Sequence, residues 1–223
     1  EPYRRQRQLC IRDRLDTDSS ILDGNVTKHN DVKGKIEFKH VSFKYPDSEE
    51  YMLEDISFKA KKGDTVAFIG STGSGKSTLI NLVPRFYDVT SGEILIDDIN
   101  VKDYNLKTLH EKIGYVPQKA VIFNDSIMNN ILYGDAGKKL TKEMGIEASK
   151  IAQADDFITK MEKEYNSHIA SGGTNVSGGQ KQRISIARAI ARKPEFYIFD
   201  DSFSALDYKT CLLYTSPSPR DST

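Results

Sequence analysis

The sequence predicts an α/β fold, with a parallel-sheet core, an antiparallel β subdomain and an inserted, mainly helical subdomain. Alternating apolar and polar residues at 36–44 and 56–60 indicate a pair of antiparallel strands. The apolar run 65–69 has the length of a buried strand and leads directly into a glycine-rich loop. Apolar spacing becomes helical within 119–192, and a second buried-strand pattern follows at 196–199. Strands and helices therefore alternate as they do in an α/β core.

Each element also has a local signal. The strand at 36–44 changes register near its centre, which predicts a β-bulge, and the polar turn 46–50 leads towards its partner. Residues 76–82 should form a helix directly after the glycine-rich loop. Three further helices are expected at 126–132, 141–154 and 156–163.

These elements divide the chain into a core and an insertion. We place the core at residues 36–118 and 193–210, and the mainly helical subdomain at 119–192. Residues 15–35 are polar and rich in Gly, Asp and Asn, so we expect them to form a linker that leads into the domain.

Both ends of the chain have an unusual origin. Residues 1–14 and 211–223 contain stretches that resemble translations of two companion sequencing adapters, so we interpret both ends as artefacts and exclude them from the fold. The only two cysteines, Cys10 and Cys211, lie in these ends. Residues 15–210 therefore have no cysteine for a disulfide, a metal cluster or a thiol nucleophile, which suits a cytosolic location.

The bulk composition excludes several classes of protein. A length of 223 residues with 38% hydrophobic and 29% charged residues fits one soluble globular domain. The 32 basic residues balance 32 acidic ones, so there is no basic surface of the kind that binds nucleic acid. No apolar run approaches the roughly 18 residues of a membrane-spanning helix. Charged residues crowd the N-terminus, which is unlike a signal peptide.

The glycine-rich loop indicates nucleotide chemistry. It reads Gly70-Ser71-Thr72-Gly73-Ser74-Gly75-Lys76-Ser77 and fits the phosphate-loop pattern G-x-x-x-x-G-K-[ST]. Successive N–H groups of such a loop converge on an anion, and Gly73 and Gly75 allow the close approach. Lys76 should reach the β- and γ-phosphates, the Ser77 hydroxyl should hold Mg²⁺, and Thr78 extends the binding set. A chance match is disfavoured by the strand predicted before the loop and the helix after it.

A carboxylate is expected beside this loop. The apolar run 196–199 ends at Asp200, so a buried strand would present this acid at the edge of the sheet where ligands bind. We expect Asp200 to bind the metal through water.

A second motif, Val176-Ser177-Gly178-Gly179-Gln180, lies about a hundred residues after the phosphate loop. In this order and at this distance it resembles the signature sequence of ATP-binding cassette (ABC) proteins. The resemblance covers roughly residues 15–210 and implies ATP and Mg²⁺ as cofactors. In that family the signature segment lies across the ATP held by a partner's phosphate loop. Residues 177–180 would then bind a partner's ATP, and two such domains would form a head-to-tail dimer.

The same resemblance assigns roles to single residues. Tyr45 matches the aromatic platform for adenine. Gln118 matches the glutamine that touches Mg²⁺ and the attacking water and links to the membrane domain. Asp201 matches the carboxylate that polarises this water, and Lys76 completes the expected catalytic set. The expected metal ligands are Ser77, Gln118 and Asp200.

The sequence departs from the family pattern in three places. Asp201 stands where most ABC ATPases have glutamate, which would make a slow or degenerate site unless the loop shifts to compensate. Ser171 stands where a glutamate usually contacts the membrane domain. The switch histidine and the last strands of the core are expected beyond residue 210, so the C-terminal part of the core is missing from this sequence.

Segments 85–94 and 122–127 look most like exporter-type, multidrug half-transporters, in which the ATPase domain follows a transmembrane domain. The predicted function is therefore ATP hydrolysis that drives export, at the cytoplasmic face of a membrane and without nucleic acid. A second possibility is a soluble ABC ATPase that acts on ribosomes, DNA or chromosomes. A third is a regulatory nucleotide-binding domain that hydrolyses slowly because of Asp201.

Overall fold

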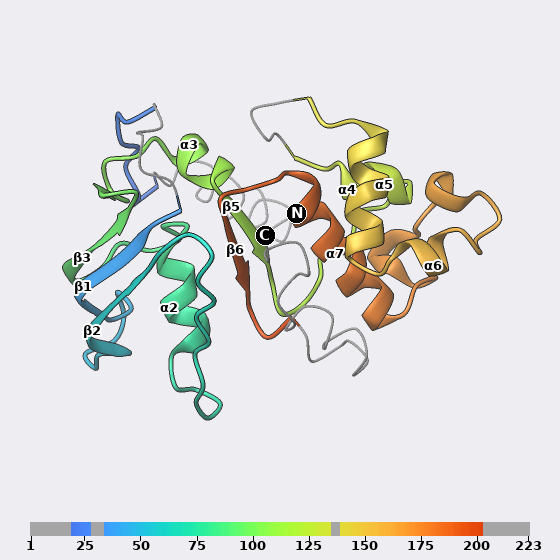
Figure 1. The fold of residues 1–223 in the computed structure, drawn as a ribbon. Coiled ribbons are helices and arrows are strands. Elements are labelled where there is room, and N and C mark those ends of the chain that lie inside the picture. The colour runs from blue at the N-terminus through green and yellow to red at the C-terminus, as the bar shows by residue number, and fades with distance from the viewer. Residues whose placement is uncertain (1–18, 28–33, 135–138, 203–223) are drawn as a thin grey trace, which may run out of the picture.

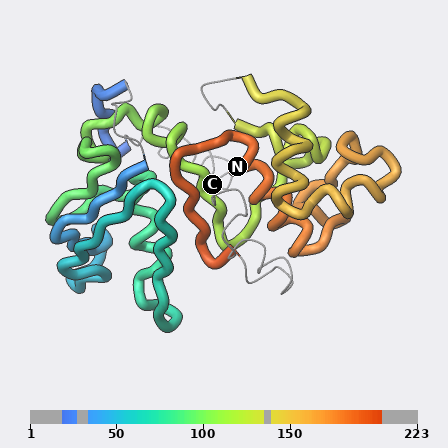
Figure 2. The backbone as a smooth tube through the Cα atoms, viewed as in Figure 1, coloured from blue at the N-terminus to red at the C-terminus, as the bar shows by residue number. Residues whose placement is uncertain are grey.

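The structure is a computed structural model that describes residues 19–27, 34–134 and 139–202. A lobe of antiparallel strands and a helical lobe lie on either side of a short parallel pair of strands (Figure 1). Figure 2 shows the backbone entering the helical lobe and returning to the centre of the molecule with its last described residues. The adapter-like ends, residues 15–18 and 28–33 of the expected linker, and residues 203–210 lie outside the described residues.

An antiparallel sheet forms the first lobe, with strand order β2-β1-β3-β4. Its strands are β1 (Ile36–Phe43), β2 (Leu53–Ala60), β3 (Ser91–Ile96) and β4 (Ile99–Asn100). The predicted strand pair is confirmed, because β1 runs antiparallel to β2 with Ile36 opposite Ala60. The predicted bulge is present as well: the register shifts between Phe38 and Val41, and His40 has a φ of 49°.

Helix α2 (Lys76–Leu82) begins where the sequence predicts it. Leu79 and Leu82 are buried in one apolar cluster with Phe38 of β1 and Ile94 of β3. Burial of each such side chain contributes about 1.5–3 kcal/mol. This packing anchors the helix that carries the end of the phosphate loop to the antiparallel sheet.

The strand predicted at residues 65–69 is wrong in this structure. The segment has no regular secondary structure, and Val66 and Ile69 are 46% and 96% exposed. A strand exists only through hydrogen bonds to a neighbour, and no strand among the described residues pairs with this segment. Phe68 makes an edge contact with Phe58 of β2, with ring centroids 5.3 Å apart.

Helix α3 (Leu106–Glu111) leads into strand β5 (Ile113–Val116), which pairs in parallel with β6 (Phe196–Phe199). The strand predicted at 196–199 is thus confirmed. Its register places Val116 opposite Phe199. The expected metal ligands Gln118 and Asp200 follow these two strands. The pairing therefore brings residues more than eighty positions apart to the same end of the pair.

A buried group of charges ties the parallel pair to the antiparallel sheet. The Lys112 Nζ lies 2.7 Å from Asp97 Oδ2 and 2.9 Å from Glu195 Oε2. The side chains of Lys112 and Asp97 are 0% exposed. Such charges are tolerated in the interior only when they are paired, because the desolvation of a lone ion costs several kcal/mol. The group therefore holds the start of β5 and the residue before β6 against the end of β3.

Part of the expected linker packs on the domain. Val26 forms a parallel bridge with Tyr104. The Asp23 carboxylate accepts from the Leu106 N–H over 2.6 Å and from the Asn105 side chain over 2.7 Å. The linker segment is thus joined to the start of α3, the helix that precedes β5.

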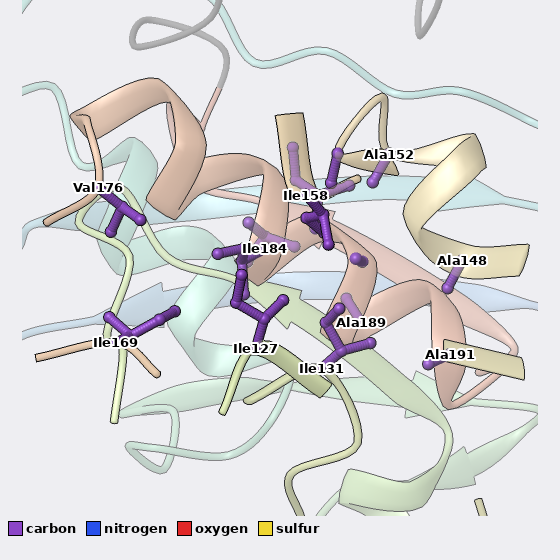
Figure 3. Close-up of a cluster of buried hydrophobic side chains, with 14 residues drawn as sticks. Ile127, Ile131, Ala148, Ala152, Ile158, Ile169, Val176, Ile184, Ala189 and Ala191 are labelled. Carbon is purple, nitrogen blue, oxygen red and sulfur yellow. The ribbon is translucent and has the colours of Figure 1, made fainter. Parts of the chain in front are cut away.

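The helical lobe contains α4 (Ile127–Ile131), α5 (Lys142–Ile151), α6 (Asp155–Ile158) and α7 (Gly178–Ala191), with short 3₁₀ turns at 164–166 and 171–173. The predicted helices near 126–132 and 141–154 are confirmed. Their N-caps are Ser126 and Thr141, which accept hydrogen bonds from the first turn. Helix α6 ends at Ile158, earlier than the predicted 156–163. Figure 3 shows the apolar cluster of this lobe around Ile184 of α7.

Candidate functional site

The phosphate loop is built from positions that only glycine fits. Gly73 and Gly75 both have a φ of 83°, in the left-handed region that side chains rarely adopt. A Cβ atom at Gly75 would lie 3.1 Å from the Met52 carbonyl oxygen, and one at Gly70 would lie 2.6 Å from Ser74 Oγ. Positive φ at Gly73 and Gly75, and the close packing of Gly75 on Met52, therefore favour glycine in this loop, as expected for a backbone cradle that curves around an anion.

Lys76 folds back over this loop. Its Nζ donates to the carbonyl oxygens of Gly70 and Ser71, over 2.7 Å each, and to Ser74 Oγ over 3.2 Å. The ammonium group is thus held beside the cradle, and its three protons can exchange a loop oxygen for a phosphate oxygen. The contact of Lys76 with phosphate stays a prediction.

The loop meets the predicted metal carboxylate directly. Ser77 Oγ, on α2, donates to Asp200 Oδ1, which follows β6, over 2.8 Å. The two residues are far apart in sequence, and the contact brings together a hydroxyl and a carboxylate. Oxygen ligands of this kind are those that Mg²⁺ prefers, so the pair fits the ion that the sequence predicts.

A tyrosine completes the surroundings of Asp200. The Tyr115 hydroxyl donates to Asn81 Oδ1 over 2.9 Å and lies 3.4 Å from Asp200 Oδ2. Burial, followed by the Asp200 charge, raises the pKa of Tyr115 to about 12. The phenol therefore stays protonated at neutral pH and can donate a hydrogen bond towards the metal carboxylate.

The two expected catalytic side chains also meet. Gln118 Nε2 donates to Asp201 Oδ2 over 3.2 Å. Both residues are exposed, so a ligand could reach them. Asp201 has a φ of 44°, in the left-handed region that is uncommon for a residue with a side chain.

Tyr45 lies close to the phosphate loop, as its predicted role requires. Its hydroxyl is 2.9 Å from Thr78 Oγ1. Its ring stands edge-on to Phe43 and Tyr87, with centroids 4.9 Å and 5.3 Å away. The ring is thus oriented by two aromatic neighbours and tied to the first turn of α2.

The second motif forms the start of α7. Ser177 and Gln180 make a reciprocal capping box: the Ser177 hydroxyl accepts from the Gln180 N–H, and the Gln180 side chain accepts from the Ser177 N–H. Ser177 and Gly178 are exposed, and Gly179 is half-buried. Helices α2 and α7 lie on opposite sides of the β5–β6 pair (Figure 1). The start of α7 is therefore accessible and lies across the strand pair from α2.

Comparison with known proteins identifies the family. Residues 53–204 match the family model described as ABC transporter. The chain belongs to the ABC transporter family. It is 46% identical over 197 residues to a protein of Staphylococcus aureus strain NCTC 8325 whose name describes a multidrug export ATP-binding/permease protein. This alignment covers 88% of the chain and 34% of the relative.

A similarly named protein from the bovine strain RF122 of the same organism is 45% identical over the same length, again with 34% of the relative covered. The chain thus spans about a third of the length of these relatives. The solved structure of a bacterial Atm1-family ABC exporter with ATP bound is 35% identical and superposes with a TM-score of 0.82. That match covers 94% of this chain and 37% of the other.

These matches confirm that the chain is an exporter-type ABC ATPase domain with the predicted α/β fold. The similarity to the solved exporter structure covers 94% of this chain. Residues 65–69 nevertheless form no strand in the present structure. Within the described residues, no helix is long and apolar enough to cross a membrane.

Sequence reasoning missed two residues that surround the site. Tyr115 lies in β5, a short strand whose Ile-Gly-Tyr-Val sequence has no alternation to reveal it. Ser202 follows the catalytic pair and is 0% exposed. The available signal for Tyr115 was a polar aromatic residue three positions before Gln118. For Ser202 we find no sequence signal.

Three tyrosines provide a test of the packing: Tyr104 is fully buried, and Tyr115 and Tyr165 are half-buried. Burial is the main cause that raises the pKa of Tyr104, Tyr115 and Tyr165 to about 12. These tyrosines ionise near pH 10 when unfolded. Their contribution to stability is therefore complete below about pH 10 and is lost as the pH rises through about 12.

We expect the ultraviolet absorbance of tyrosinate to rise in two stages, with Tyr104, Tyr115 and Tyr165 ionising late and together with unfolding. Burial also raises the pKa of Tyr197, so this tyrosine should join the later stage. Tyr115→Phe should remove one late ionisation. If all tyrosines ionised together near pH 10 while circular dichroism stayed native, the described burial would be wrong.

Proposed function

We propose that this ABC ATPase domain binds Mg²⁺–ATP at the phosphate loop and hydrolyses it to drive export through a transmembrane domain. The hydrogen bond between Ser77 and Asp200 carries the proposal, because it joins a glycine cradle for phosphate to a carboxylate for the metal. The printed names of the relatives, which combine an ATP-binding part with a permease, support the export role.

Each residue of the site has a proposed part in binding. Tyr45 stacks on adenine, and the loop N–H groups with Lys76 and Thr78 bind the phosphates. Ser77, Gln118 and Asp200 would hold Mg²⁺, which neutralises charge on the phosphate oxygens when it is bound. The hydroxyl, amide and carboxylate oxygens of these residues suit a hard cation.

Asp201 is the proposed base. Its carboxylate accepts a hydrogen bond from the attacking water and polarises it, while the amide of Gln118 orients both groups. The Tyr115 hydroxyl lies 3.4 Å from Asp200 Oδ2 and can turn its single proton from Asn81 to that carboxylate. The bond between Gln118 and Asp201 is already present in the structure.

The proposed assembly is a head-to-tail dimer at the cytoplasmic face of a membrane. Ser177, Gly178 and Gly179 lie at the start of α7, away from the chain's own phosphate loop (Figure 1). The exposed N–H groups at this helix start suit a phosphate held by a second domain. A transmembrane domain that precedes residue 15 would be moved by the closing and opening of this dimer.

Two alternatives to this proposal are a soluble ABC ATPase and a slowly hydrolysing regulatory domain. A soluble ABC ATPase is disfavoured by the export names of the relatives. A slow regulatory domain has one specific observation in its favour, the aspartate at position 201.

Turnover separates the active domain from the regulatory one. We expect the complete protein that contains residues 15–210, in lipid nanodiscs, to hydrolyse ATP with a kcat of at least about 0.1 s⁻¹, below the usual range of enzymes because of Asp201. Chelation of Mg²⁺ should abolish phosphate release. ATP binding without Mg²⁺-dependent hydrolysis would contradict the proposal and favour the regulatory domain.

A further inference from the structure

Ser202 is fully buried although its neighbour Asp201 is exposed. Its hydroxyl donates to the Val116 carbonyl oxygen over 2.8 Å. The same oxygen accepts from the backbone N–H of Asp200 over 3.0 Å. A carbonyl oxygen has two lone pairs, so it can accept both bonds at once. The residue between them, Asp201, is therefore held from both sides through a single atom of β5.

These bonds form part of a closed ring. Val116 lies two residues before Gln118, and the Gln118 amide donates to Asp201 Oδ2 over 3.2 Å. The ring thus runs along the chain from Val116 to Gln118, crosses to Asp201, and returns through Ser202 to Val116. The hydrogen bond from Ser202 to Val116 closes this ring.

The backbone at Asp201 needs such a constraint. Its φ of 44° lies in the left-handed region, which residues with a side chain keep only when their surroundings hold them there. The first anchor, the Asp200 N–H, continues the ladder of the β5–β6 pair. The second anchor comes from the Ser202 side chain, whose hydroxyl ties the residue after Asp201 to the same carbonyl oxygen of β5.

We propose that Ser202 is a positioning residue for ATP hydrolysis: its hydroxyl fixes the backbone at position 201 so that the aspartate carboxylate stays against Gln118. The inference rests on the proposed role of Asp201 at the attacking water. An aspartate has one side-chain torsion fewer than a glutamate, so it cannot correct an error in backbone position. A displacement of about 1 Å can slow a reaction about 100-fold, which makes the anchor matter most for the shorter acid.

A purely structural role makes a different prediction. The Ser202 hydroxyl also lies 3.3 Å from the Asp200 carbonyl oxygen, so it could simply satisfy a buried polar group. Loss of that hydroxyl would then lower stability and leave kcat of the folded protein unchanged.

The test uses the complete protein that contains residues 15–210, with kcat and ATP affinity measured for each variant. Ser202→Ala should lower kcat about ten-fold while the Kd for ATP stays within about two-fold. Ser202→Thr and Ser202→Val form a matched pair of nearly equal volume, of which only threonine keeps the hydroxyl. We expect the threonine variant to be at least about five-fold faster than the valine variant.

A second background sharpens the test. In Asp201→Glu, the longer side chain can correct its own position, so Ser202→Ala should lower kcat by no more than about two-fold. The effect of Ser202→Ala on kcat would then differ between the two backgrounds, which a purely structural role of Ser202 would not produce.

Three results would overturn the inference: an unchanged kcat in Ser202→Ala, equal rates for the threonine and valine variants, or the same loss in both backgrounds. If the unmodified protein hydrolysed ATP in any of these cases, only the role of Ser202 would be wrong. If neither it nor Asp201→Glu hydrolysed bound ATP, the proposed function would be wrong, and this inference with it.

Discussion

Replacement of Lys76 by alanine is expected to weaken ATP binding about 100-fold, because a charge-assisted hydrogen bond contributes about 1.5–3 kcal/mol and the loop also loses its own internal partner. The Lys76 ammonium group holds the carbonyl oxygens of Gly70 and Ser71 at 2.7 Å each. Without it, the cradle loses both its positive charge and the contacts that fold it back on itself.

In Lys76→Ala, kcat/KM for ATP hydrolysis should fall further than the affinity for ATP. Charge develops on the transferred phosphate group in the transition state, so a lysine beside it stabilises that state more than bound ATP. We expect kcat at saturating ATP to drop about another 100-fold, and kcat/KM about 10⁴-fold.

The measurements are a titration with a fluorescent ATP analogue and steady-state phosphate release. Lys61→Ala is a matched control, because Lys61 is also an exposed lysine and precedes the phosphate loop in sequence. It should change neither quantity more than about two-fold. If Lys76→Ala kept normal affinity, the ammonium group would not contact the phosphates, and the proposed site would be wrong.

Features that depend on a few neighbouring residues could be predicted from the sequence. Helix α2 begins at Lys76, where the sequence predicts it, and helix α7 begins directly after Ser177 of the second motif. Each is decided by residues within one helical turn: a glycine with a positive φ before the first, and a Ser–Gln capping box at the second. The position of Asp200 after β6 follows in the same way, since an apolar run ending in an acid is a local pattern.

Features that depend on partners far away in the sequence could not be predicted. The apolar run 65–69 has the composition of a buried strand, yet strand formation requires a hydrogen-bonded neighbour, and no described strand provides one. Strand β5 shows the reverse. Its four residues carry almost no periodic signal, and pairing with β6 makes them a strand.

The site itself shows the same division. The sequence indicates Ser77, Gln118 and Asp200 by motif and order, and the structure brings Ser77 to 2.8 Å from Asp200. Tyr115 and Ser202 reach the same place only because β5 and β6 are parallel neighbours. The pairing of Lys112 with Asp97 and Glu195 joins three separate elements, so no local pattern could indicate it.

Asp201→Glu is expected to raise kcat about 10- to 100-fold with little change in ATP affinity, because a misplacement of about 1 Å can cost about 100-fold in rate. Aspartate is one methylene shorter than the glutamate usual in this family, by roughly one C–C bond of about 1.5 Å. Binding depends on Tyr45, Lys76 and the loop, and none of these residues contacts Asp201 in the bonds described above. Its carboxylate instead bonds to Gln118, the other residue expected beside the water.

Asp201→Asn separates charge from size. Asparagine has almost the same shape but cannot accept a proton from the attacking water, so kcat should fall about 100-fold while the Kd for ATP stays within about two-fold. Together the two substitutions distinguish a carboxylate that is too short from one that takes no part.

Single-turnover measurements on the assembled dimer would show how the aspartate acts in its natural setting. If a partner domain carries glutamate at the matching position, the dimer should have one fast and one slow site, and Asp201→Glu should make both fast. The slow site would then follow from geometry: a short side chain, held by a left-handed backbone at a φ of 44°, reaches Gln118 but leaves the water farther from its carboxylate. Two equal rates that Asp201→Glu does not change would mean that the backbone already compensates for the missing methylene, and that the aspartate does not slow the site.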